Sequence, residues 1–132
     1  MARREFACSD ARVKPRVRLA VAFVVARLAN GSSVDSIFDC VTKRRVRFGG
    51  TTRTDFINVF DGELGAHLTG TGESGRFKLV HYGESHRITL EMDGTHFEGF
   101  DHGTSSRFNG HVRGATVTFL DHGEGQSFEY SV

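Results

Sequence analysis

Alternating apolar and polar residues recur in short runs, about every twenty residues, from residue 36 to the end of the chain. Each run holds an apolar residue followed by Asp or His, at Phe38-Asp39, Phe60-Asp61, Val80-His81, Phe100-Asp101 and Leu120-Asp121. Eight residues after each of these apolar positions comes another, at Val46, Leu68, Ile88, Phe108 and Phe128. Five units at one period are typical of a repeat architecture.

Each unit predicts two short strands joined by a turn, because its apolar residues alternate with polar ones. In the fourth unit we expect strands at residues 97–102 and 107–112, with a loop at residues 103–106. This register places Asp101 opposite Phe108, and Met92 opposite Thr95. Successive units are expected to join through two-residue turns, where glycine tolerates the positive φ, at Ser74-Gly75, Asp93-Gly94 and Arg113-Gly114.

The predicted meander has one apolar face, because side chains alternate between the two faces of a strand. The residues expected on this inner face are Ile57, Val59, Leu68, Phe77, Leu79, Ile88, Leu90, Met92, Phe97, Phe108, Val112, Val117, Phe119, Phe128 and Tyr130.

A helix is the other element that the sequence predicts, over residues 15–30. Its run Leu19–Ala26 is apolar on all sides, which is typical of a buried helix. Ten strands spaced about 4.8 Å apart would form a sheet about 48 Å wide, which a helix roughly 20 Å long cannot cover when the sheet is flat. We therefore expect the sheet to curl into a barrel or roll, with the helix packed against or inside it. Four inward glycines would leave room for the helix: Gly70, Gly72, Gly99 and Gly110.

The fold class is thus mainly β, with five antiparallel hairpin repeats and one N-terminal hydrophobic helix. A parallel β-solenoid with a helical cap explains the constant period equally well and remains the alternative. We divide the chain into a basic tail at residues 1–14, the helix at 15–30 and the repeats at 36–132. Residues 15–132 are expected to form a single domain.

The charge of the chain is nearly balanced, with a formal net charge of +1 over 132 residues. This balance argues against a nucleic-acid partner, which normally requires a clustered basic face. Cys8 and Cys40 fit neither a disulfide framework nor a metal-binding pair, which favours reduced thiols in the cytoplasm. The alternative is secretion, with residues 1–26 as a cleaved signal peptide. No segment of the sequence is apolar for long enough to predict a transmembrane helix.

The polar residues that follow each apolar position should gather at one rim of the sheet. Carboxylate and imidazole groups there would suit a small ligand or a divalent cation. The alternative is that each aspartate caps its own turn, which repetition in every unit favours. The sequence predicts no cofactor and leaves a divalent cation as the alternative. The candidate ligand residues are Asp61, His81, Asp101, His102, Asp121 and His122.

A second candidate site is a row of apolar residues on the outward face, which the repeat brings to Phe38, Phe60, Val80, Phe100 and Leu120. Such a row on a polar face is typical of a protein-binding surface. Neighbouring long side chains are the alternative explanation, since arginine stems can cover aromatic rings. The candidate interaction residues are Phe38, Phe60, Tyr82, Phe100, Arg87 and Arg107.

Hairpin repeats of this length, rich in aromatic residues and glycine, resemble the choline-binding repeats of cell-wall proteins and the glycan-binding repeats of toxins. Those families build their ligand cages from tryptophan or several tyrosines in each unit. This chain has no tryptophan, and its tyrosines are Tyr82 and Tyr130. The resemblance therefore covers the period and the hairpins, and it leaves a glycan as a minor alternative ligand.

Catalytic motifs are absent from the sequence, since no serine has a GxSxG context and no histidine has an HExxH context. We therefore expect a non-enzymatic module that binds a protein partner or further copies of itself. The alternative is a module that binds a small ligand, a glycan or a metal ion through the Asp and His rim.

Overall fold

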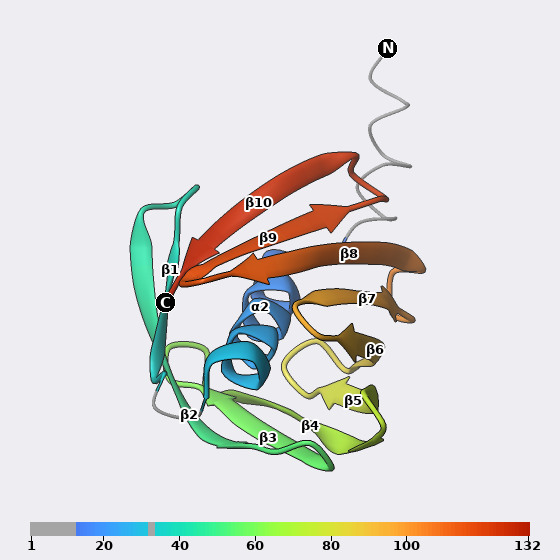
Figure 1. The fold of residues 1–132 in the computed structure, drawn as a ribbon. Coiled ribbons are helices and arrows are strands. Elements are labelled where there is room, and N and C mark those ends of the chain that lie inside the picture. Colours follow the sequence, from blue (N-terminus) through green and yellow to red (C-terminus); the bar gives the residue numbers. More distant parts are fainter. Residues whose placement is uncertain (1–12, 32–33) are drawn as a thin grey trace.

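Ten antiparallel strands close into a barrel around one helix in the computed structural model, which describes residues 13–31 and 34–132 (Figure 1). Each strand pairs with the next along the chain, and the last pairs with the first. The predicted barrel is confirmed, and the solenoid alternative is wrong because every strand pair is antiparallel. The elements are α2 (Pro15–Asn30), β1 (Ser36–Asp39), β2 (Arg44–Thr52), β3 (Phe56–Asp61), β4 (Ala66–Glu73), β5 (Arg76–His81), β6 (His86–Asp93), β7 (His96–Asp101), β8 (Ser106–Arg113), β9 (Thr116–Asp121) and β10 (Gln126–Ser131).

Five four-residue turns lie at one end of the barrel and join the strands within each repeat, at residues 40–43, 62–65, 82–85, 102–105 and 122–125. Each turn closes on a residue with positive φ, such as Ser85 at 61° and Gly125 at 69°. The expected loop at residues 103–106 was therefore wrong by one position. Asp101 pairs with Ser106 instead of Phe108, because its carboxylate caps the turn that begins directly after it.

Two-residue turns lie at the opposite end and join the last four repeats to one another, whereas residues 53–55 join the first repeat to the second. The turn at Ser74-Gly75 is confirmed, since Glu73 pairs with Arg76. The other two turns begin one residue later than expected, at Gly94 and Gly114, where φ is 63° and 59°. Glycine in the first turn position is the requirement of a type II′ hairpin, whereas an Asp-Gly centre suits type I′. Met92 consequently pairs with Phe97 instead of Thr95.

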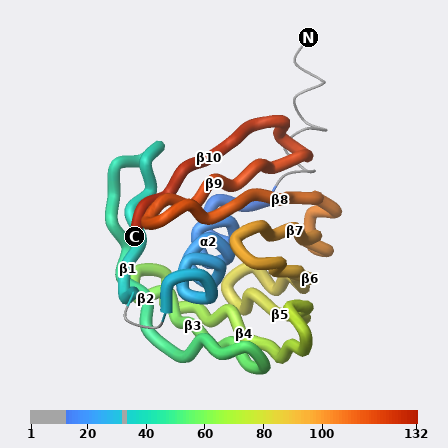
Figure 2. Tube along the Cα trace, viewed as in Figure 1, coloured from blue at the N-terminus to red at the C-terminus, as the bar shows by residue number. Residues whose placement is uncertain are grey.

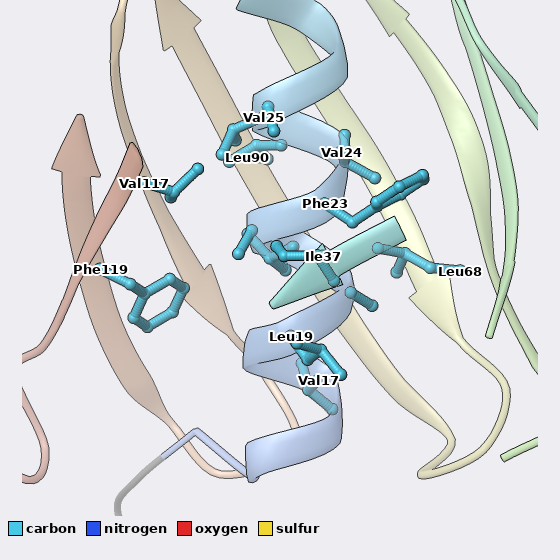
Figure 3. Packing of buried hydrophobic residues seen from close by; sticks show 14 of the residues in the cluster. Val17, Leu19, Phe23, Val24, Val25, Ile37, Leu68, Leu90, Val117 and Phe119 are labelled. Carbon is cyan, nitrogen blue, oxygen red and sulfur yellow. The ribbon is translucent and has the colours of Figure 1, made fainter. Parts of the chain in front are cut away.

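The helix α2 runs through the interior of the barrel, as the ribbon shows (Figure 1). All residues from Val17 to Arg27 are buried, so no side of these three turns faces solvent. Val17, Leu19, Phe23, Val24 and Val25 point from the helix toward apolar side chains of the surrounding strands (Figure 3). The run that the sequence also allowed as a signal segment is thus the centre of the core.

The inner face of the barrel carries the residues that the alternation predicted. All of them are buried except Met92, which is partly buried at the end of β6. The two register errors did not change this result, because a shift of two residues returns each side chain to the same face. Rings fill much of the interior, with Phe23 stacked on Phe48 at 4.6 Å and Phe108 stacked on Phe119 at 4.8 Å between centroids.

The inward glycines make room for neighbouring strands and rings, which corrects the expectation that they make room for the helix. A Cβ atom at Gly99 would overlap the carbonyl oxygen of Thr89 and the ring of Phe108. A Cβ atom at Gly110 would likewise lie 2.7 Å from the ring of Phe97. Phenylalanine lying over a cross-strand glycine is a known way of filling such positions.

The helix spans the barrel from one set of turns to the other. It begins at Pro15, beside the four-residue turns, and its last residue, Asn30, donates a hydrogen bond to the carbonyl oxygen of Gly114 in a two-residue turn. The chain then forms the hairpins in order around the helix, and β10 returns beside β1 (Figure 2). The tail predicted at residues 1–14 lies mostly outside the described residues, but Val13 is fully buried.

Candidate functional site

The repeated aspartates lie at the end of the barrel that carries the four-residue turns, which we call the aspartate end. One carboxylate oxygen of each aspartate accepts hydrogen bonds from its own turn. For Asp61 the donors are the amides of Glu63 and Leu64, at 2.9 and 3.0 Å, and for Asp101 the donor is Gly103 at 2.8 Å. Asp39 and Asp121 do the same. The turn-capping interpretation is confirmed for these four residues.

Two of these aspartates also hold the segment where the chain enters the barrel. Asp121 Oδ2 accepts a hydrogen bond of 2.8 Å from the amide of Val13. Asp61 lies 2.8 Å from the Arg16 guanidinium. Arg16 also donates a hydrogen bond to the carboxylate of Glu63. This second hydrogen bond holds the pKa of Glu63 below its usual value. These carboxylates surround the N-terminal end of α2, where the helix dipole favours negative charge.

His81 replaces aspartate in the third repeat and performs the same capping task. Its Nδ1 atom accepts a hydrogen bond of 3.1 Å from the amide of Glu84, so the ring is neutral in this arrangement. Burial lowers the pKa of His81, and the charge of Glu84 opposes that shift. Asp101, which is fully buried, contacts His86 Nδ1 at 3.1 Å. The buried candidates therefore use their polar atoms within the turns and at the helix entrance.

The remaining candidates of the rim, His102 and His122, point outward from the turns and are exposed. The ring of His102 lies edge-on to Phe100, with 4.8 Å between centroids. His122 Nε2 is 2.6 Å from the amide oxygen of Asn109. The structure thus places the six candidates on two different faces, since four point inward and these two point outward. In the part of the chain that the structure describes, no three metal-ligating side chains gather closely enough to hold a metal ion.

Two buried arginines at the ends of the apolar run were missed by the sequence analysis. Arg18 Nε donates a hydrogen bond of 2.7 Å to the Tyr130 hydroxyl, and its guanidinium lies 3.5 Å from the centroid of the Phe128 ring. Arg27 donates to the carbonyl oxygens of Val34 and Gly50. Burial raises the pKa of Tyr130 to about 12. The sequence could have predicted their burial from their positions directly beside the apolar run, because a helix that is enclosed over its whole length must bury its flanking charges too.

The outward apolar row is present but not continuous. Its members lie on alternate strands, and the strand between two members contributes polar residues. Between Phe60 and Val80, for example, β4 places His67 and Thr69. Neighbours also cover the rings: the Arg45 guanidinium lies 5.7 Å from the Phe38 centroid, and Phe60 contacts His67. The candidates Arg87 and Arg107 are exposed on β6 and β8, next to Val80 and Phe100.

A different set of apolar residues gathers at the aspartate end. Five large apolar side chains of the described residues are exposed, and four of them lie on or next to consecutive turns at this end. Leu64 extends toward the next turn, at residues 82–85. A Cβ atom built on Gly83 in that turn would lie 3.1 Å from the Cδ2 atom of Leu64. We call these residues the apolar patch: Val41 (58% exposed), Phe60 (37%), Leu64 (44%) and Tyr82 (62%).

A shallow groove of about 490 Å³ crosses the outer face of β6, β7 and β8. Its lining includes Glu91 and Glu98, which lie directly opposite each other on paired strands, an arrangement that is unfavourable for like charges. The groove is also lined by Phe100, Arg107 and Asn109. The polar lining is mixed in charge, and the hollow is open to solvent.

Comparison with known proteins identified no relative: no family model, curated protein or solved structure matches this chain. Within residues 13–31 and 34–132, no helix has both the length and the hydropathy that a membrane span requires.

Proposed function

We propose that this barrel is a protein-binding module that contacts its partner through the apolar patch at the aspartate end. The observation that carries this proposal is the placement of four of the five exposed large apolar side chains of the described residues on or next to neighbouring turns. Exposed apolar residues that gather in one place mark interaction surfaces, whereas scattered ones need no explanation.

The interior of the barrel supports the same proposal. The helix α2 and the inward side chains occupy the space where many barrels hold a small ligand. The aspartates at the barrel mouth direct their oxygens to turn amides, Val13 and Arg16. A surface for binding is therefore left on the outside of the barrel.

Closure of the sheet further defines how a partner would bind. Every strand has a hydrogen-bonded neighbour on each side, although β1 and β10 pair over two residues only. The closed sheet therefore offers a partner no full-length edge on which to add a strand. We therefore expect binding through side chains, and aromatic residues such as Tyr82 are enriched at the centres of such interfaces.

Photocrosslinking tests the proposal directly. We would introduce benzoylphenylalanine at Tyr82 in the patch and, as the matched control, at Phe56, which is 36% exposed at the opposite end of the barrel. We expect irradiation in an extract of the producing cells to yield a defined protein adduct from position 82 and none from position 56. A second copy of the chain as the adduct would identify self-association. No adduct from position 82, or the same adducts from both positions, would contradict the proposal.

A further inference from the structure

A basic strip runs from the turn before β2 onto the first residues of that strand, beside the apolar patch. It consists of Lys43, Arg44, Arg45 and Arg47, all of which are exposed. The packing of β2 depends on the inward residues Val46 and Phe48, which are 4% exposed. The core of the barrel therefore does not depend on the four cations of the strip.

Most of this positive charge is not neutralised within the described part of the chain. Arg44 contacts Glu63, which it shares with Arg16. Arg45 donates a hydrogen bond to the Ser36 hydroxyl, and the side chains of Lys43 and Arg47 contact no acidic group among the described residues. Like charges this close repel one another and lower the free energy of unfolding, so a role outside the fold is needed to explain them.

The strip is continuous with the apolar patch. Val41 belongs to the same turn as Lys43, and Phe60 on β3 pairs with Gly49 on β2. A Cβ atom at Gly49 would meet nothing within 4 Å, so the surface between Arg47 and Phe60 is open. A single partner could thus contact both surfaces.

We propose that the basic strip binds an extended acidic segment of the protein partner that contacts the apolar patch, an inference that rests on the function proposed above. Arg45 and Arg47 point outward from one strand about 7 Å apart, which is also the spacing of alternate residues in an extended peptide. Carboxylates at every second position of the partner would therefore meet successive guanidinium groups, which bind carboxylates in a bidentate manner.

An acidic polypeptide fits this surface better than a nucleic acid does. The adjoining patch includes the aliphatic side chains Val41 and Leu64, which suit a protein interface. Nucleic-acid surfaces carry a more extensive positive field, whereas this chain has a net charge of +1 and places Glu91 and Glu98 on the outer face of β6 and β7.

Fluorescence anisotropy tests the inference with a labelled peptide that carries glutamate at every second position and leucine or serine between. We expect saturable binding that weakens as salt is raised. The double variant Arg45→Glu and Arg47→Glu should weaken it by about tenfold or more, since two favourable contacts become repulsive. The control, Arg76→Glu and Lys78→Glu, makes the same charge change on β5 and should leave the affinity within about twofold. If the double variant is unstable, Arg47→Glu alone carries the test.

Three outcomes would overturn the inference: no binding of the acidic peptide, equal weakening by both double variants, or tighter binding of an oligothymidylate of similar length. Photocrosslinking from position 82 in the Arg45→Glu and Arg47→Glu background separates this inference from the proposed function. An undiminished adduct would refute the role of the strip while the binding module stands. Peptide binding without any adduct from position 82 would refute the module and retain the acidic specificity of the strip.

Discussion

Replacing Phe23 by alanine is the sharpest test of the enclosed helix. The Phe23 side chain is fully buried at the middle of α2. Its ring stacks on the ring of Phe48, with 4.6 Å between the two centroids. The Arg27 guanidinium lies 4.8 Å from the same ring. Alanine favours helix formation, so the substitution removes packing without disturbing the helix backbone.

The expected loss follows from these contacts. Truncation of a buried phenylalanine to alanine costs about 3–5 kcal/mol, because the transfer free energy is lost and a cavity remains. The closed barrel prevents the strands from collapsing onto the helix, which places Phe23→Ala in the upper part of this range, at about 4 kcal/mol. A domain of this size has a total stability of about 5–15 kcal/mol, so the variant should remain folded with little reserve.

Urea unfolding followed by circular dichroism measures this loss as a lower midpoint with an unchanged slope. Phe56→Ala is the matched control, because Phe56 is 36% exposed at the end of β3, and it should cost about 0.5 kcal/mol or less. A loss for Phe23→Ala below about 1 kcal/mol, or one equal to the control, would refute the conclusion that the helix forms the centre of the core. Should Phe23→Ala fail to fold, Phe23→Leu would provide the measurement with a smaller cavity.

Two further predictions concern the strands and the turns. Gly99→Ala should lower the free energy of unfolding by about 1–3 kcal/mol through overpacking against Phe108, whereas Gly49→Ala, whose Cβ atom would meet nothing within 4 Å, should have no such cost; equal midpoints in urea would contradict the assigned contacts. Burial lowers the pKa of His81 in the folded protein. As the pH falls below about 6.5, the unfolded chain therefore binds a proton at this residue at a higher pH than the folded chain does. The free energy of unfolding should therefore decrease below that pH, and less steeply in His81→Gln; parallel pH profiles of the two proteins would show that His81 is not the residue responsible.

The overall architecture could be predicted from the sequence because two independent patterns agreed. Alternation assigned the inward residues of the strands, and the all-round apolar run Leu19–Ala26 required burial on every side. The roughly 48 Å width of a flat ten-stranded sheet then made curling necessary. The inner face survived errors in register because side chains return to the same face after a shift of two residues.

The details that the sequence did not predict depend on local geometry. The turn at Gly94 starts one residue late because glycine is needed at its first position, and Asp93-Gly94 fits two turn types until φ is known. Gly99 and Gly110 were assigned to contacts with the helix, since the rings of Phe108 and Phe97 that cover them come from paired strands whose register was off by two residues. The basic strip escaped notice because the overall charge is nearly balanced.

The seam between β1 and β10 has a consequence for how the chain is made. It pairs Phe38 with Ser131 and Asp39 with Tyr130. The first strand, β1, therefore gains its second neighbour only after β10 has been synthesised. During synthesis from the N-terminus, α2 leaves the ribosome first and stays uncovered on one side until the fifth repeat follows. A chain that stops before β10 would leave an apolar helix and two strand edges open to other chains, which are the conditions for aggregation. The final repeat therefore closes the strand edges through which the newly made chain could pair with other chains.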